Sequence, residues 1–221
     1  MTIEDPERAL AISYAPRHAQ AALGALFALD ESLATLLRTT TEPMLGQMRL
    51  TWWRDRLIGL DEGPPPGEPV LQAIAGEVLP LGMRGAALVP IVEGWHELVG
   101  NEALDRAALE RFAAGRGTLF GIGGQLCGAA SGDPLAAAGQ GWALADLARH
   151  LSDPGEAGLA RELAGAWLAE AAAARWSRGG RAFGALAHLA RIDLALPADA
   201  PAPVGAPGRV WRMLWHRLTG R

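Results

Sequence analysis

The chain of 221 residues contains no lysine and only one cysteine, so its 20 basic residues are all arginines. A single cysteine, Cys127, excludes a disulfide within the chain, which is typical of a reducing compartment. Its apolar, glycine-rich surroundings predict a small buried core residue. The formal net charge of −4 and the pI of about 5.7 exclude a general basic field. We therefore expect no nucleic acid among the partners.

The sequence also has few β-branched residues and no segment with the period-two alternation of a half-buried strand. Alanine and leucine dominate an apolar fraction of 50%, and both residues favour helices. No apolar run approaches the roughly 18 residues of a membrane span without a charge, glycine or proline. The first residues, MTIEDPERAL, have no apolar segment of the kind found in secretory signals. These absences predict an all-α protein, and the chain is long enough to bury a sizeable core.

Capping residues followed by proline, as at Asp5-Pro6 and Asp153-Pro154, predict several helix starts. The expected helices cover about residues 5–13, 17–38, 44–60, 70–78, 84–99, 104–130, 134–151, 155–176, 181–193 and 209–218. We divide the chain into a helical domain at 1–196, a Pro/Ala-rich linker at 197–208 and a basic amphipathic helix at 209–221.

The acidic pair Asp30-Glu31 lies in the middle of an apolar helical run. Two carboxylates at positions i and i+4 of a helix can share a Mg²⁺ ion, which can then hold a diphosphate. Position 34 is Ala34, and Glu31 is rotated by about 100° from Asp30. Asp30 is therefore the single candidate metal ligand. The alternative is a partly buried acid that pairs with an arginine, for which Arg38, Arg49 and Arg54 are candidates.

The next helix carries arginines beside tryptophans in the segment GQMRLTWWRDRL. Arg49, Trp53 and Arg56 fall at i, i+4 and i+7 on one face. Two guanidinium groups over an indole suit an anion such as a diphosphate. They suit an ion pair with Asp30 equally well, so both interpretations stay open.

Two later segments offer weaker candidates. Asp146 and His150 lie in the core-like helix GWALADLARHL, where a lone histidine is usually structural. The glycine-rich segment 115–132 lacks the preceding strand that a dinucleotide-binding loop needs. Its small residues at three- or four-residue spacing favour close helix packing, or a slot for an alkyl chain between helices.

The last segment, GRVWRMLWHRLTGR, combines arginines with an apolar stripe at 211, 214, 215 and 218. A basic amphipathic helix with interfacial tryptophans can lie on an anionic membrane surface. Docking on the protein's own core is the alternative. The candidate membrane contacts are Arg209, Trp211, Arg212, Trp215 and Arg217.

The segments FALDESLA and GQMRLTWWRDRL resemble the squalene/phytoene synthase family. FALDESLA is similar to the family's first aspartate-rich helix, with Asp30 and Glu31 at its start and Ala34 in place of the second aspartate. GWALADLARHLSD stands where a second aspartate motif belongs, but its asparagine is missing and its acids are differently spaced. The resemblance implies an all-α isoprenoid-synthase fold, in which two aspartate motifs face each other across a central cavity and hold Mg²⁺ and a prenyl diphosphate.

The degenerate motifs lead us to expect a divergent, non-catalytic member that binds an isoprenoid or lipid and requires no cofactor. The alternative is an active prenyltransferase that condenses two prenyl diphosphates with Mg²⁺, using Asp30, Glu31 and Arg49. A helical interaction module with a filled core is a third hypothesis.

The G-x-M-R-x-x-x-W arrangement looks most like a branch of the family that includes a mitochondrial complex I assembly factor and its bacterial relatives. This implies a membrane surface or a respiratory-complex subunit as partner. It also implies a cytoplasmic protein that is peripheral at the inner membrane.

Overall fold

The computed structural model describes residues 5–100, 103–197 and 200–221, and the regular structure of these residues is entirely helical. The prediction of an all-α fold is confirmed. The α-helices are α1 (Pro6–Ile12), α2 (Arg17–Thr39), α3 (Pro43–Gly59), α4 (Pro69–Ala73), α5 (Val89–His96), α6 (Arg106–Leu126), α7 (Leu135–Leu147), α8 (Pro154–Ala173), α9 (Arg181–Leu194) and α10 (Pro207–Thr219).

The helix starts follow the capping chemistry of the sequence. The Asp5 carboxylate accepts hydrogen bonds from the backbone N–H groups of Glu7 and Arg8 at the start of α1. Asp105 and Asp153 cap α6 and α8 in the same way. A side-chain acceptor at such a position satisfies N–H groups that have no partner within the helix.

Two of the expected helices are divided. The predicted helix 70–78 consists of α4 and a π-helical turn at Ile74–Val78, and a 3₁₀ turn at Leu79–Leu81 follows. The chain then turns at Gly82, whose φ of 88° is readily adopted by glycine. The predicted helix 84–99 begins as a 3₁₀ turn at Gly85–Leu88 and continues as α5.

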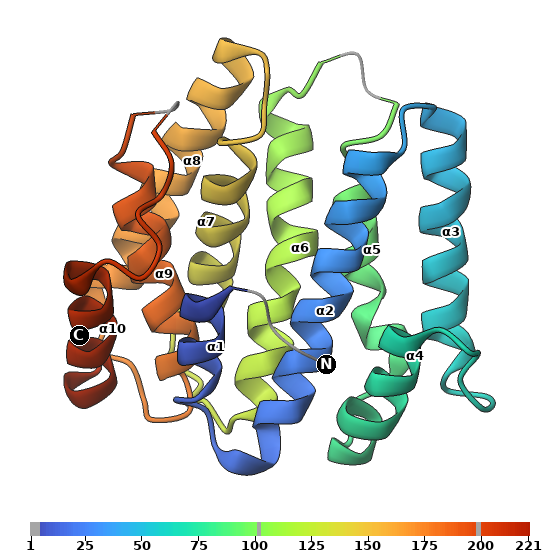
Figure 1. Ribbon diagram of the computed structural model, residues 1–221, viewed down its shortest axis with the longest axis horizontal. Helices are drawn as coiled ribbons and strands as arrows, with labels where there is room; N and C mark the ends of the chain where they lie inside the picture. Colours follow the sequence, from blue (N-terminus) through green and yellow to red (C-terminus); the bar gives the residue numbers. More distant parts are fainter. Residues whose placement is uncertain (1–4, 101–102, 198–199) are drawn as a thin grey trace.

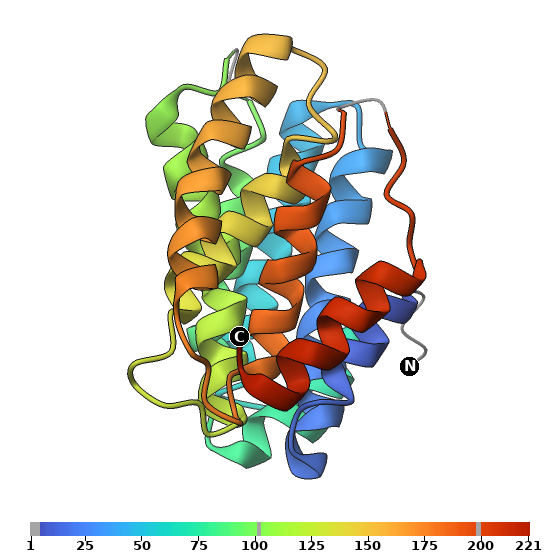
Figure 2. The same ribbon diagram turned by 90° about the vertical axis from the view of Figure 1, so that its left-hand side faces the viewer.

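The long helices form a bundle around α6 (Figure 1). α6 packs against α5 and α7, and α7 packs against α8 and α9. α3 lies at one edge of the bundle and α10 at the opposite edge. Figure 2 shows α10 crossing the bundle obliquely, close to α9 and α1.

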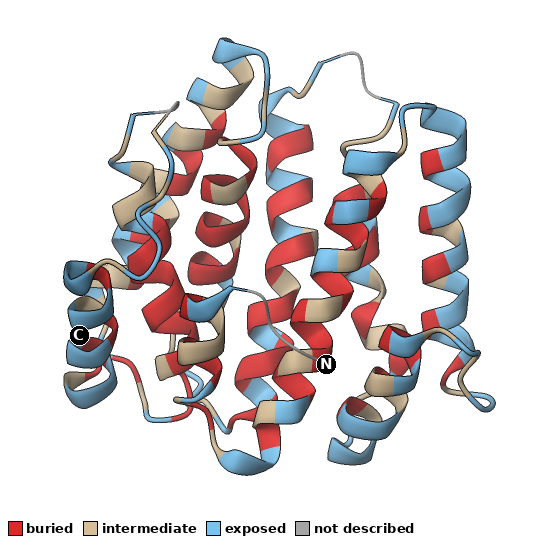
Figure 3. Cartoon of the chain, viewed as in Figure 1, coloured by how far each residue is buried: buried red, intermediate tan, exposed pale blue. Residues whose placement is uncertain are grey.

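The buried residues line the inward sides of the helices and form one continuous hydrophobic core (Figure 3). α2 is long and apolar enough to cross a membrane by length and composition alone, but half of that apolar stretch is buried inside the bundle. The core helix of a globular protein has the same properties, so we interpret α2 as a core helix.

Candidate functional site

Arg116 lies in α6 where this helix is closely packed against α5 and α7. A Cβ atom on Gly115 would lie 2.6 Å from the Gly94 Cα, and one on Gly117 would lie 2.9 Å from the Gly139 carbonyl carbon. Because no side chain fits at such distances, these positions require glycine. Gly115 and Gly117 flank Arg116, so the two close helix contacts fix the backbone from which its side chain extends.

The guanidinium of Arg116 joins two carboxylates from different helices. Its Nε and Nη2 atoms donate to the two oxygens of Asp30 in α2, each at 2.8 Å. Its Nη1 atom donates to Asp146 Oδ2 in α7 at 2.6 Å. The bidentate pair with Asp30 is the geometry in which an arginine binds a carboxylate most strongly.

Two tryptophans complete this cluster. The Arg116 Cζ atom lies 4.5 Å from the ring centroid of Trp95 and 4.3 Å from that of Trp142, both within cation–π range. The Trp95 indole N–H also donates to Asp30 Oδ1 at 3.0 Å. Both oxygens of Asp30 are thus engaged by protein donors, and this side chain is only 1% exposed.

The electrostatics of the cluster favour its charged form. Burial by itself lowers the pKa of a guanidinium, but Asp30 and Asp146 outweigh it and hold the pKa of Arg116 above its ordinary value. Burial raises the pKa of a carboxyl group, yet the charge and hydrogen bond of Arg116 hold the pKa of Asp146 below its usual range. The side chain of Asp146 remains 41% exposed, because it lines a cavity.

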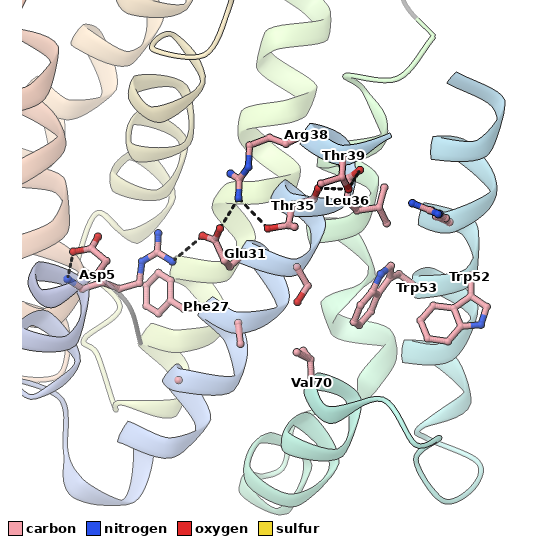
Figure 4. Close-up of a pocket in the computed structure, with 15 residues that line it drawn as sticks. Asp5, Phe27, Glu31, Thr35, Leu36, Arg38, Thr39, Trp52, Trp53 and Val70 are labelled. Carbon is pink, nitrogen blue, oxygen red and sulfur yellow. Dashed lines mark hydrogen bonds and ion pairs between the residues drawn. The ribbon is translucent and has the colours of Figure 1, made fainter. Parts of the chain in front are cut away.

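A cavity of about 980 Å³ lies between α2, α3 and α4. Figure 4 shows Phe27 and Leu36 on its α2 side, and Trp53 and Val70 on its α3 and α4 side. The charged side chains in its wall are Asp5, Arg8, Glu31, Arg38 and Arg49. Its volume is near the upper end of the roughly 300–1,000 Å³ typical of small-molecule sites.

A second cavity of about 540 Å³ adjoins the first, and Arg8, Glu31 and Arg38 line both. Arg116 and Asp146 line only the second cavity. Glu31 accepts a hydrogen bond from Arg38 Nη2 at 2.7 Å and lies 3.7 Å from Arg8 Nη1 (Figure 4). Glu31 and Arg38 are half exposed, so water weakens their ion pair.

The structure divides the other predicted site residues between these cavities. Arg49 and Trp53 line the larger cavity, and Arg49 donates to Thr40 Oγ1 at 3.0 Å. His150 lines the smaller one, with its Nδ1 atom 2.9 Å from the Asp146 carbonyl oxygen. Arg56 is not among the lining residues of either cavity. It lies over the Trp52 ring at 5.8 Å on the exposed side of α3.

The predicted arginine partners of Asp30 are wrong. Arg38 pairs with Glu31, Arg49 donates to a threonine, and Arg54 pairs with Asp55. The reason is the rotation of about 100° between adjacent residues of a helix. Glu31 is half exposed and meets Arg8 of α1 and Arg38 of α2, whereas Asp30 points inward to Arg116 of α6.

The glycine-rich segment serves close packing, as one of the two sequence interpretations predicted. A Cβ atom on Gly123 would lie 2.5 Å from the Phe183 ring, and one on Gly124 would lie 2.3 Å from Leu135. No glycine of this segment is among the lining residues of either cavity. Cys127 is buried at 5% exposure, as predicted.

The comparisons with known proteins concern the family and the fold of the chain. A sequence profile of squalene/phytoene synthases matches residues 2–118, which is more than half of the chain. The chain belongs to the squalene/phytoene synthase family. The crystal structure of a dehydrosqualene synthase in complex with ligand superposes with a TM-score of 0.69 at 15% identity, covering 93% of this chain and 88% of that chain.

No curated protein matches the chain. The family match and the superposition confirm the isoprenoid-synthase fold expected from the sequence. The comparisons do not distinguish the branches of the family, so the assembly-factor branch remains a prediction.

Mg²⁺, the metal implied by the resemblance to this family, does not fit the residues present. A Mg²⁺ site uses free carboxylate oxygens, but both oxygens of Asp30 accept hydrogen bonds from Arg116. Ala34 offers no ligand one turn further, and Asp146 pairs with the same guanidinium. Within residues 5–100, 103–197 and 200–221, no three His, Cys, Asp or Glu side chains are grouped to hold a metal ion.

Arg116 is a site residue that the sequence patterns considered above do not identify. One signal was present, because Arg116 is the only charged residue between Arg111 and Asp133. A lone charge between two glycines of an apolar helix needs a buried partner. The sequence could not name that partner, since Asp30 lies 86 residues away.

Proposed function

We propose that this protein is a divergent, non-catalytic member of its family that binds an isoprenoid or a similar single-chain lipid in the larger cavity. The observation that carries the proposal is the engagement of Asp30 by Arg116. Ionising a prenyl diphosphate requires positive charge that stabilises the leaving group. Here the two carboxylates that face each other hold an arginine side chain instead.

The wall of the larger cavity supports binding of a ligand with a long apolar part. Phe27, Leu36, Trp53 and Val70 provide apolar surface along α2, α3 and α4. Burying such a chain stabilises the complex by about 25 cal/mol for each Å² of apolar surface removed from water. Arg49 has a neutral hydroxyl as its hydrogen-bond partner and lines the same cavity, so it is available to a polar or anionic head group.

The test is calorimetric titration with farnesyl diphosphate, geranylgeranyl diphosphate and neutral farnesol, each with Mg²⁺ and with a chelator. We expect binding that is unchanged by the chelator and no release of diphosphate. Mg²⁺-dependent release of diphosphate that is lost in Asp30→Asn would overturn the proposal and support the prenyltransferase alternative.

Two glycine variants locate the ligand. Gly24 lines the larger cavity, and a Cβ atom there meets nothing within 4 Å. Gly24→Leu should therefore place a side chain in the cavity, with no clash at its Cβ atom, and weaken binding at least ten-fold. Gly121 on α6 also has open space around its Cβ and lines neither cavity, so Gly121→Leu is the matched control. Equal affinities in the two variants would exclude this cavity as the binding site.

We extend the proposal to an accessory role at the inner membrane or on a subunit of a respiratory complex. This part rests on the sequence resemblance to the assembly-factor branch alone. Affinity purification of the full chain from membranes, followed by identification of co-purified proteins, tests it. Recovery of the chain in the cytoplasmic fraction without partners would contradict it.

A further inference from the structure

α10 is fixed to the bundle through its inner face. The buried guanidinium of Arg209 forms two hydrogen bonds of 2.7 Å with the carboxylate of Glu7 in α1. It also pairs with Asp193 in α9. Met213 and His216 follow on the same face and are fully buried. The predicted membrane contact at Arg209 is therefore wrong, because this side chain holds α10 against α9 and α1.

The outer face of α10 is apolar and faces solvent. It carries Val210, Trp211, Leu214, Trp215 and Leu218, whose exposed fractions range from 37% for Leu214 to 68% for Leu218. The rings of Trp211 and Trp215 lie side by side with centroids 6.5 Å apart. Single exposed apolar residues are common on proteins, but five on one face of a short helix form a patch that needs an explanation.

The surroundings of this patch are basic. Arg217 is exposed and lies 4.9 Å above the Tyr14 ring, and Arg221 is also exposed. Arg212 donates to His188 Nε2 at 2.8 Å. Burial and then the charge of Arg191 lower the pKa of Arg212, as expected where cations lie near one another. The carboxylates that pair with α10 in the described part of the chain, Glu7 and Asp193, both bind the buried guanidinium of Arg209, which offsets one of their two negative charges.

We propose that the outer face of α10 binds the surface of a bilayer containing anionic lipids, with the helix axis parallel to the membrane plane. Tryptophan side chains favour the membrane–water interface, and arginines near the surface attract anionic head groups. The ion pairs of Arg209 hold the helix with its apolar face outward, so no rearrangement of the bundle is needed. This proposal is independent of the cavity and its ligand.

The test is co-sedimentation of the full chain with vesicles of phosphatidylcholine alone or with 30% phosphatidylglycerol. We expect binding to the anionic vesicles, weakened by high salt, and at least ten-fold weaker binding for Trp211→Ser/Trp215→Ser. Met44→Ser/Met48→Ser removes two exposed apolar side chains from α3, at the opposite edge of the bundle, and should bind normally. Circular dichroism checks that both variants are folded.

A second pair of variants separates charge from apolar contact. Arg217→Gln/Arg221→Gln should lower the affinity for anionic vesicles about five-fold per arginine. Arg106→Gln/Arg111→Gln makes the same change of net charge on α6 and should have little effect. Absent binding to anionic vesicles, or equal loss in both members of either pair, would overturn the proposal. So would self-association in solution that the double tryptophan variant abolishes, since the patch would then bind a second copy.

Discussion

Replacing Arg116 by methionine should lower the free energy of unfolding by about 3–5 kcal/mol, because it leaves the carboxylate of Asp30 buried without its cation. Asp30 is only 1% exposed. The loss is a large fraction of the roughly 5–15 kcal/mol by which domains are stable. Asp30→Asn should cost less than Arg116→Met, because Asp146 remains as a partner for the guanidinium.

The double variant Asp30→Asn/Arg116→Met removes both charges and should be more stable than the sum of the single effects predicts. We expect a coupling energy of at least about 2 kcal/mol from urea unfolding. Circular dichroism and tryptophan fluorescence should be followed together, since coincident transitions justify a two-state treatment.

The pair Glu31 and Arg38 is the matched control, because both side chains are half exposed. Glu31→Gln/Arg38→Met should give a coupling of about 0–1 kcal/mol. A coupling between Asp30 and Arg116 as small as that of the control would refute the reasoning that Arg116 neutralises a buried charge.

Three further predictions follow from buried groups. Burial and nearby arginines hold the pKa of His188 at about 3 and that of His216 at about 4. Both stay neutral in the fold while the unfolded chain binds protons below about pH 6.5, so stability should fall by about 1.4 kcal/mol per pH unit for each histidine between pH 6.5 and 4. His216→Gln should reduce the slope of the unfolding free energy against pH, measured by urea unfolding at several pH values. An unchanged slope would contradict the lowered pKa of His216. Gly117→Ala should destabilise by about 1–3 kcal/mol in thermal unfolding, whereas Gly121→Ala, with open space around its Cβ, should not. Burial raises the pKa of the Cys127 thiol to about 12. Iodoacetamide at pH 8 should therefore label this thiol only when the protein unfolds. Rapid labelling of the native protein would contradict the burial of Cys127.

Local chemistry made most of the fold predictable. Asp5-Pro6 and Asp153-Pro154 mark helix starts through contacts within three residues, so one stretch of sequence contains all the information. The acidic pair on α2 was predictable as a site for the same reason. Its chemistry was not, because Arg116 is a distant residue that only tertiary packing brings to Asp30.

The orientation of α10 has a similar cause. Its apolar stripe suggested either docking on the core or contact with a membrane. The structure buries the opposite face instead, because Arg209 meets Glu7, which lies 202 residues away. An ion pair between residues so far apart in sequence leaves no local pattern, so the rotation of this helix could not be predicted.

The position of Arg116 also determines how many substitutions separate this cluster from a metal site. Ala34→Asp alone would add a carboxylate beside a cluster in which two carboxylates already share one guanidinium. Loss of Arg116 alone would lower the free energy of unfolding by about 3–5 kcal/mol, because Asp30 would stay buried without its cation. Each single step is therefore unfavourable. The guanidinium between Asp30 and Asp146 thus separates the present cluster from a metal-binding one by more than one substitution.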